Sequence, residues 1–287
     1  MSAVPGFFSD YQQRVDRELR RLVPANGSRV QQSMAYTVHA PSKRVRAVLT
    51  LLCAELCGGS APRAVAAATA IELVHASSLI LDDLPSMDDA PLRRGQPSNH
   101  VAFGEAIAIL AAVGLLNLAY GALSKGYDAP LSAAVSALLS DAVGLDGLIG
   151  GQAEDLLAMA QTVSFETLER IHRGKTGALF VASATAGALT AGAGADHRQW
   201  LGAFAKNLGL AFQIIDDLLD VEGQPEETGK AVRADIKKTT FVSFSGVSGA
   251  RQLATELCQT ADRALTPFGR RADHLRALSA FVAARHA

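Results

Sequence analysis

The sequence has few cysteines, few aromatic residues and no excess of charge of either sign. Three of its 287 residues are cysteine, Cys53, Cys57 and Cys258, and none belongs to a CxxC pair of the kind that binds zinc. We therefore expect reduced thiols in the core of a cytoplasmic protein. The 27 basic and 28 acidic residues give a formal net charge of −1, so no overall positive field exists for nucleic acid or an anionic membrane. Any anion that binds must be held by a local cluster of cations.

A targeting segment is also lacking, and no transmembrane span is expected. The N-terminal region has no basic stretch followed by an apolar one, and it contains Asp10, Asp16 and Glu18. Two stretches, Ala106–Ser124 and Thr176–Ala195, carry no charge over about twenty residues, the length that spans a bilayer. Both are rich in small residues, which favours buried helices of a large helical domain over the alternative of membrane helices.

Runs of alternating β-branched residues are absent, whereas Ala and Leu are frequent and apolar residues recur at spacings of three and four. This periodicity predicts an all-α protein. Because no repeat or low-complexity linker interrupts the chain, residues 1–287 are expected to form a single domain. The expected helices cover residues 8–22, 28–39, 43–57, 62–83, 101–124, 129–143, 146–159, 165–189, 197–221 and 248–284.

Against this apolar background stand two acidic segments. The first is SLILDDLPSMDDAPLRRG, residues 78–95. Pro85 cannot continue a helix, because proline lacks the N–H group and clashes with the preceding turn. Asp82 and Asp83 are therefore predicted on the last turn of a long apolar helix, and Asp88 in the loop beyond it.

The second acidic segment is LGLAFQIIDDLLDVEG, residues 208–223, where Gln213, Asp216, Asp217 and Asp220 form one helical stripe. Such a stripe is usually a solvated face, but the apolar arc around it is too wide for a surface helix. Carboxylates about 4 Å apart repel by about 4 kcal/mol at an effective dielectric of about 20. Mg²⁺ relieves this repulsion and binds carboxylate and phosphate oxygens together. The two segments are therefore predicted to form two walls of one cavity, bridged by Mg²⁺ and a polyphosphate.

A polyphosphate also requires cations, and His75 is predicted to face the same cavity, because it lies seven residues before Asp82 on one helical face. A single basic cluster is usually a solvated surface, whereas several beside two acidic segments indicate anion sites. The four basic clusters are SKRVR (residues 42–46), LRRG (92–95), HRGKTGA (172–178) and TGKAVRADIKKTT (228–240).

In this order the segments resemble the motifs of the trans-isoprenyl diphosphate synthases, the polyprenyl synthetase family. DDLPSMDDAPLRRG resembles the first aspartate-rich motif with its RRG, and FQIIDDLLD resembles the second motif, FQxxDDxxD. SKRVR resembles the GKRxRP element, GGQAEDL the GQxxDL element and HRGKTGAL the KT segment. The set covers residues 43–240, and the combination is specific although a lone DDxxD is not. The resemblance implies an all-α isoprenoid synthase bundle around a central cavity.

The resemblance also implies roles for the matching residues, with three Mg²⁺ ions and an allylic diphosphate between the two motifs. The metal ligands, direct or one shell removed, would be Asp82, Asp83, Asp88, Asp216 and Asp220. The allylic diphosphate would be held by Arg93, Lys175, Lys230 and Lys238. The diphosphate of isopentenyl diphosphate would be held by Lys43, Arg46, His75 and Arg94. The polar oxygens that favour the developing allyl cation would come from Thr176 and Gln213. The catalytic set would thus be Lys175, Thr176, Gln213 and Lys230.

The sequence departs from the family pattern at two places in the first basic cluster. Pro41 and Ser42 replace two glycines, and Ala47 replaces a proline, which predicts a different loop over the isopentenyl diphosphate site. The stretch before Lys238 is shorter than in many relatives, which leaves the role of Lys238 open.

Product length is predicted from the helix before Asp82. In the family, bulky side chains about five residues before the first aspartate form the floor of the tail cavity, and here Ser77 and Ser78 stand there. Small side chains leave room beyond C15, so geranylgeranyl diphosphate (C20) is predicted over farnesyl diphosphate (C15). The alternative is that the serines only let helices pack closely and that another residue sets the floor, the candidates being Ile109, Leu115 and Leu116.

The expected substrates are isopentenyl diphosphate and an allylic starter, which is dimethylallyl, geranyl or farnesyl diphosphate. A homodimer is expected by resemblance, through helices near residues 101–124. One alternative is a class I terpene cyclase, which needs many aromatic side chains, whereas aromatic residues make up 6% of this sequence. The other is a regulatory subunit without activity, which tends to lose one aspartate motif, whereas both are intact here.

Overall fold

The computed structural model describes residues 6–159, 161–222 and 239–284, and these residues form a bundle of α-helices with one short hairpin. The predicted all-α fold is confirmed. The helices and strands in chain order are α1 (Gly6–Leu22), α2 (Arg29–Val38), α3 (Val45–Leu56), α4 (Ala61–Asp82), β1 (Leu92–Arg93), β2 (Gln96–Pro97), α5 (Asn99–Phe103), α6 (Glu105–Gly126), α7 (Ala129–Val143), α8 (Leu148–Leu157), α9 (Phe165–His172), the π-helical turn η1 (Arg173–Gly177), α10 (Ala178–Thr190), α11 (Ala195–Glu222), α13 (Phe241–Ala264), the 3₁₀ segment η2 (Thr266–Ala272) and α14 (Asp273–Ala283).

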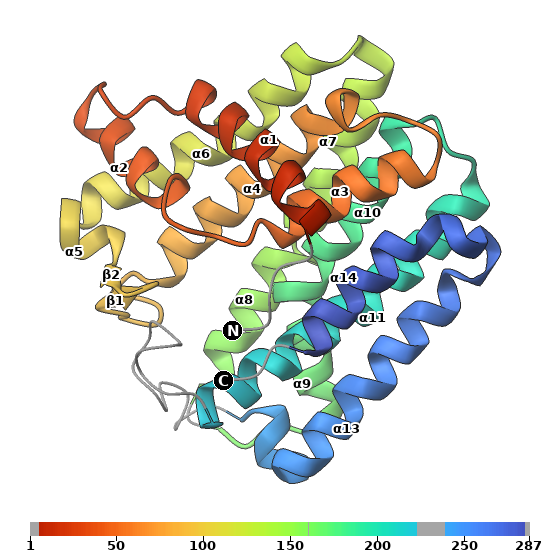
Figure 1. Cartoon of the computed structure of the whole chain (residues 1–287). Coiled ribbons are helices and arrows are strands. Elements are labelled where there is room, and N and C mark those ends of the chain that lie inside the picture. Colours follow the sequence, from red (N-terminus) through yellow and green to blue (C-terminus); the bar gives the residue numbers. More distant parts are fainter. Residues whose placement is uncertain (1–5, 160, 223–238, 285–287) are drawn as a thin grey trace.

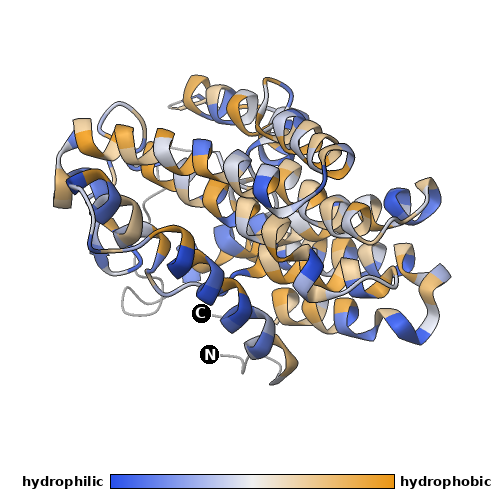
Figure 2. Ribbon diagram, turned by 90° about the horizontal axis from the view of Figure 1, so that it is seen from above, coloured by the Kyte–Doolittle hydropathy of each residue, from blue (hydrophilic) through white to orange (hydrophobic). Residues whose placement is uncertain are grey.

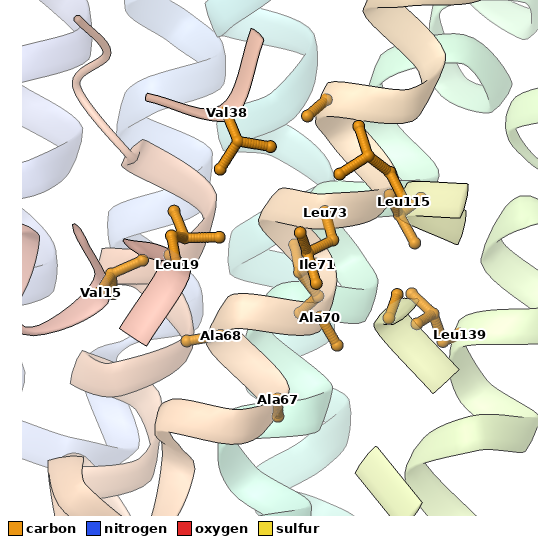
Figure 3. Close-up of a cluster of buried hydrophobic side chains, with 14 of the residues drawn as sticks. Val15, Leu19, Val38, Ala67, Ala68, Ala70, Ile71, Leu73, Leu115 and Leu139 are labelled. Atoms are coloured by element: carbon orange, nitrogen blue, oxygen red, sulfur yellow. The ribbon is translucent and has the colours of Figure 1, made fainter. Parts of the chain in front are cut away.

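Helix α4 runs through the centre of the bundle. It packs against α1, α2, α3, α6 and α10, and most of its side chains are buried. Figure 3 shows Ala70 and Ile71 of α4 between Leu19 of α1 on one side and Leu139 of α7 on the other. The many alanines of α4 have small side chains, so its backbone lies close to the neighbouring helices. Because most of its residues are apolar, α4 has no polar face along most of its length. Its last residue, Asp82, thereby emerges directly from the core.

A second core joins α3, α10, α11 and α14 around Phe8, Phe180 and Phe204. A smaller third one joins α9, α11 and α13 around Phe241. In Figure 1, α2, α5 and the hairpin lie on one side of the molecule, and α11, α13 and α14 on the opposite side. Figure 2 shows hydrophobic and hydrophilic positions alternating along the outer helices, as expected where one face of each helix is buried.

Three helical stretches of the described chain are long and apolar enough to cross a membrane by length and composition, namely Ala61–Asp82, Glu105–Gly126 and Ala129–Leu157. In the first, 67% of the most apolar window is buried inside the bundle, so its apolar side chains form part of the core. In the second the buried share is 39%, because α6 keeps an exposed apolar face.

Three expected helices are interrupted where the sequence analysis predicted continuity. The helix expected over residues 101–124 is divided into α5 and α6 at Gly104, whose φ is 86°. The helix expected over residues 165–189 is divided into α9 and α10 by the π-helical turn η1. The helix expected over residues 248–284 begins earlier, at Phe241, where Thr240 caps it, and it breaks at η2. Gly269 within η2 has a φ of 57°, a left-handed value that ends regular helix, which the continuous apolar spacing did not reveal.

Candidate active site

The first aspartate-rich segment begins on the last residue of α4, as predicted from Pro85. Asp82 ends the helix and Asp83 caps it. The following loop folds back, since the N–H of Asp88 donates to the carbonyl of Asp82 (3.0 Å) and the N–H of Ala90 to that of Asp83 (3.2 Å). These bonds satisfy carbonyls that the end of a helix leaves open. They also keep the backbone of Asp88 beside Asp82.

The Asp82 carboxylate is surrounded by groups from three other segments. Its Oδ1 accepts hydrogen bonds from Gln152 Nε2 (2.8 Å) and Lys175 Nζ (3.1 Å), and Arg93 Nη2 lies 3.7 Å from Oδ2. Lys175 Nζ also donates to Asp155 Oδ2 at 2.8 Å. The side chain of Asp82 is 15% exposed, so it remains partly open to solvent. One ammonium group thus joins α4 to α8.

Two glycines explain how α8 and η1 come so close. At Gly151 a Cβ atom would lie 2.2 Å from the backbone nitrogen of Lys175, and at Gly174 it would lie 3.0 Å from the Cα of Gly151. No side chain fits at this crossing. The glycines of GGQAEDL and HRGKTGAL therefore set the register that places Gln152, Asp155 and Lys175 around Asp82.

Asp83 and Arg93 form a tight ion pair beneath the site. Arg93 Nε donates to both carboxylate oxygens of Asp83 at 2.9 and 3.1 Å, and Arg93 Nη2 donates to Oδ1. Burial by itself would lower the pKa of Arg93, but the hydrogen bonds and charge of Asp83, together with Asp82 and Asp88, raise it. The Asp83 side chain is 3% exposed, so its contacts match the predicted role one shell away from a metal rather than direct ligation.

The cationic pair Arg93–Arg94 lies on a hairpin that the sequence analysis did not predict. β1 and β2 have two residues each, too short for a periodic signal, and they pair antiparallel. The two turn residues, Arg94 and Gly95, have φ values of 55° and 75°, the sign that the favoured two-residue hairpin turn requires. A left-handed φ is unusual for arginine and typical of functional sites. Burial, together with Arg44 and Arg93, lowers the pKa of Arg94.

The second aspartate-rich segment lies on α11 and meets the first through η1. Thr176 Oγ1 donates to Gln213 Oε1 at 2.9 Å, while the preceding residue, Lys175, contacts Asp82. Gly209 allows this approach, because a Cβ atom there would lie 3.3 Å from the Cα of Gly177. Lys175 and Thr176, consecutive residues of one π-helical turn, therefore contact the first and the second motif respectively. This contact is expected if the two motifs form two walls of one cavity. Such turns are frequently found at functional sites.

Within the second motif the aspartates divide into two groups. Asp216 and Asp220 are half-buried, whereas Asp217 is 5% exposed. Asp217 Oδ1 accepts from Gln213 Nε2 (3.0 Å), and its Oδ2 accepts from the backbone N–H of Phe241 (3.0 Å), the first residue of α13. Asp217 thus anchors α13, which leaves Asp216 and Asp220 as the candidate ligands on this wall.

Replacing Asp217 with alanine is expected to lower the free energy of unfolding by about 3 kcal/mol, because one buried and one half-buried donor lose their acceptor. Urea unfolding of the Asp217→Ala variant measures this, with the exposed Asp141→Ala on α7 as the matched control. Unchanged unfolding combined with lost Mg²⁺ dependence would contradict the structural role and would make Asp217 a ligand.

The residues predicted for the second diphosphate gather around Arg46. Arg46 Nη1 lies 3.4 Å from His75 Nε2, and its guanidinium stacks over the rings of Phe180 (4.7 Å) and Phe212 (5.8 Å). Burial, and then the charges of Arg46 and Arg94, hold the pKa of His75 well below its ordinary value. His75 is therefore neutral in the free protein, and a bound anion would favour its protonation.

Lys43 is exposed, and its ammonium lies 5.2 Å from the ring centroid of Phe281 on α14. The C-terminal helix thus contributes to the edge of the same basic region. Lys230 and Lys238, both predicted for the allylic diphosphate, lie outside the described residues.

The donor set fits Mg²⁺ held jointly with phosphate. In residues 6–159, 161–222 and 239–284, no three His, Cys, Asp or Glu side chains converge on a ready-made metal site. Mg²⁺ is usually bound by one or two carboxylates together with substrate phosphates, and it does not need such a cage. Asp82 and Asp88 on one wall, and Asp216 and Asp220 on the other, supply hard oxygen ligands of this kind.

From the GGQAEDL element, the sequence suggested for Asp155 either an orienting role in the cavity or a buried hydrogen bond, and it suggested no role for Gln152. Gln152 and Asp155 are three apart on α8 and therefore share one helical face, a signal that was present in the sequence. Of the two ring partners of Arg46, Phe212 is the first residue of FQIIDDLLD, whereas Phe180 looks like an ordinary core residue in the sequence.

Comparisons with known proteins give the same picture as the geometry. The family model described as polyprenyl synthetase matches residues 28–262. Farnesyl diphosphate synthase of Geobacillus stearothermophilus is 39% identical, over 92% of this chain and 91% of its own length. Geranylgeranyl diphosphate synthase of Cyanophora paradoxa is also 39% identical, over 95% and 93%. An FPP/GFPP synthase structure from Zymomonas mobilis superposes with a TM-score of 0.86 at 35% identity, covering 97% of this chain and 98% of that one.

Proposed function

The chain belongs to the polyprenyl synthetase family and is a short-chain trans-prenyltransferase, and from this premise we propose that its product is geranylgeranyl diphosphate. Its substrates are isoprenyl diphosphates, which we propose to be isopentenyl diphosphate and the allylic starters dimethylallyl, geranyl and farnesyl diphosphate. Enzymes of this family are Mg²⁺-dependent, and we propose three ions in each site.

The allylic diphosphate is proposed to lie between the two aspartate motifs. Mg²⁺, when bound by Asp82, Asp88, Asp216 and Asp220, would act as a Lewis acid on the leaving group. Lys175 and Arg93 already lie within 4 Å of Asp82, so their cations are placed before substrate arrives. Preorganised charge of this kind lowers the barrier without reorganisation during the reaction. We propose that these two side chains then donate to the diphosphate oxygens.

Bond making follows from the same arrangement. When the allylic C–O bond breaks, the positive charge develops on carbon near Thr176 and Gln213, whose mutual hydrogen bond fixes both side chains. Arg46, Lys43, Arg94 and His75 would hold isopentenyl diphosphate, whose double bond attacks the cation to form the new C–C bond. The proton lost in this step would pass to the departing pyrophosphate, so no protein nucleophile is needed.

The choice of C20 over C15 rests on one observation, an apolar region deep in the bundle that is lined partly by alanines. It contains no space wide enough for a water molecule, so a prenyl tail would enter it by displacing side chains. It is bordered by small residues of α4 and α10 facing larger ones of α6 and α7. The bordering residues are Ala67, Ala70, Ile71, Leu123, Val135, Leu138, Leu139, Ala182 and Ala186.

Its depth matches a fourth isoprene unit. At about 1.5 Å per residue, Ile71 and Ala67 lie about 17 Å and about 22 Å along α4 from Asp82. Four carbon–carbon bonds of about 1.5 Å advance an extended chain by about 5 Å, so a C15 tail reaches about 15 Å and a C20 tail about 20 Å. The last unit of a C20 product would therefore enter this region, which a C15 product would not reach.

Ser77 and Ser78 stand at the position where the family has bulky floor residues. Ser77 is turned toward α6, where its hydroxyl donates to the carbonyl of Ala112 at 2.9 Å. Ser78 is half-buried, and its hydroxyl donates to the carbonyl of His75. Because neither side chain is bulky, we propose that the floor lies further down, around Ala70.

A product assay tests this function. The purified chain, given Mg²⁺, isopentenyl diphosphate and each allylic starter in turn, is expected to accumulate C20 product, identified by mass spectrometry. Chelation of Mg²⁺ with EDTA is expected to stop turnover, and added Mg²⁺ to restore it. Accumulation of C15 with no extension of farnesyl diphosphate would overturn the product length, and no condensation at all would favour the regulatory subunit.

The exposed apolar face of α5 and α6 supports a homodimer. Val101, Leu110 and Val113 are each more than half exposed in the single chain, and apolar patches of this kind mark interaction surfaces. We propose that a second copy covers them, which light scattering would detect as twice the mass of the chain. A cytoplasmic location is proposed from the cysteines, which are all free thiols.

A further inference from the structure

Arg44 is the buried member of the first basic cluster. It is 6% exposed, whereas Lys43 beside it is exposed and Arg46 is half-buried. Its φ is 50°, a left-handed value that is unusual for a large side chain. Such a conformation persists only where surrounding contacts over-determine it. The contacts of the Arg44 side chain should therefore account for its left-handed conformation.

The guanidinium of Arg44 joins three helices that precede or line the site. Its Nε donates to Asp16 Oδ1 of α1 at 2.9 Å, and its Nη1 lies 3.4 Å from Glu72 Oε2 of α4. Its Nη2 donates to the carbonyl of Val38, the last residue of α2. A planar fork of five donors suits several acceptors at once, which a lysine ammonium does not.

Glu72 connects this cluster to the start of α3. Its Oε2 faces Arg44, and its Oε1 accepts from the backbone N–H of Ala47 at 3.3 Å. The Glu72 side chain is 2% exposed and lies one turn before His75 on α4. The first turn of α3 is thereby tied to the helix that carries His75 and, ten residues after Glu72, Asp82.

We call Arg44, together with its partners Asp16, Glu72 and the Val38 carbonyl, the anchor. Lys43 precedes Arg44 in the chain, and Arg46 follows it. With Arg44 fixed, the loop backbone can place Lys43 near Phe281 and Arg46 beside His75. Asp16 and Glu72 also neutralise the Arg44 charge, so it does not compete for an incoming anion. The anchor therefore acts on the two flanking cations and leaves the diphosphate to them.

Resting on the proposed function, we propose that Arg44, held by Asp16, Glu72 and the Val38 carbonyl, is a positioning residue that presents Lys43 and Arg46 to the diphosphate of isopentenyl diphosphate. The allylic diphosphate site, built on Asp82, Arg93 and Lys175, does not depend on this anchor. The two substrates should therefore respond differently when the anchor is weakened.

Calorimetric titration of each substrate alone with Mg²⁺ tests this without turnover. We expect Arg44→Lys and Asp16→Asn to weaken the binding of isopentenyl diphosphate about tenfold, and to leave geranyl diphosphate binding within about twofold. Asp16 is 31% exposed at the rim of the cluster, so Asp16→Asn keeps the fold where a change at Glu72 could disrupt it. The matched controls are Arg17→Lys and Asp10→Asn, two exposed positions on the same helix.

Four outcomes would overturn the proposal. Equal weakening of both substrates would show a general structural effect, and wild-type affinity in Arg44→Lys would show that charge without the fork suffices. A wild-type chain that binds neither diphosphate would overturn the proposed function and this inference with it. Wild-type binding with unchanged variants would overturn the inference alone.

Discussion

Replacement of Asp82 with alanine is expected to reduce kcat about 1,000-fold or more. This carboxylate ends α4, faces the cavity and already holds Lys175 and Gln152. Without it, the first motif loses its main metal ligand and Lys175 loses one of its two carboxylate partners. A thousandfold loss corresponds to about 4 kcal/mol at about 1.4 kcal/mol per factor of ten. This is within the several kcal/mol that a metal ion contributes to charge stabilisation.

Steady-state kinetics at saturating Mg²⁺ measure this effect, and thermal unfolding checks that the variant is folded. Asp10→Ala, an exposed carboxylate on α1, is the matched control and is expected to keep its activity within about twofold, as surface substitutions do. A folded Asp82→Ala variant with normal turnover would rule out the proposed metal site. A wild-type chain without turnover, whose partner binding survives Asp82→Ala, would identify a regulatory subunit.

Replacement of Val135 with phenylalanine is expected to shift the product from C20 to C15. Val135 lies on α7, is 2% exposed and borders the apolar region beside Ala70. The larger ring would occupy the space proposed for the fourth isoprene unit, while the first three units would remain unobstructed. Because one or a few methylene groups discriminate by about 10–200-fold, the C20 to C15 ratio should fall about tenfold or more.

Mass spectrometry of the products, with farnesyl diphosphate as the starter, measures the shift. The neighbouring Ala134→Phe is the matched control, because Ala134 is exposed on the same helix and should leave the products unchanged. Ser77→Phe distinguishes the two candidate floors, since its ring would first meet the backbone of α6 at Ala112. An unchanged C20 product in Val135→Phe, together with C15 in Ser77→Phe, would move the floor up to Ser77.

The helix content, the position of Asp82 and the acidic stripe of α11 were predictable because they depend on local signals. Periodicity reports one helix at a time, and Pro85 fixes a helix end from its own chemistry. The expected helices 62–83 and 129–143 accordingly match α4 and α7 to within one residue at each end. The breaks at η1 and η2 were missed, because the helices were assigned from the apolar spacing on either side, although Pro267 and Gly269 are local helix-breaking signals at η2.

Only those features of the site that depend on one segment of the chain could be predicted from the sequence. Asp217 was placed in the acidic stripe of α11 without a role, since nothing local reveals that Phe241, twenty-four residues later, donates to it. Arg93 and Arg94 were correctly seen as a basic pair, but their hairpin depends on two positive φ values that no composition signal announces for arginine. Contacts between segments far apart in the chain decide such roles, and a single sequence does not contain them explicitly.

Helix α4 also separates two traits that natural selection can act on. Its C-terminal end carries Asp82 and the ionisation chemistry, and its middle, three turns and more away, borders the region that we propose limits the tail. On that proposal, a single substitution near Ala70 or Val135 would change the length of the product without touching the residues of the ionisation site. Product length could then vary between related chains while the chemistry stays the same.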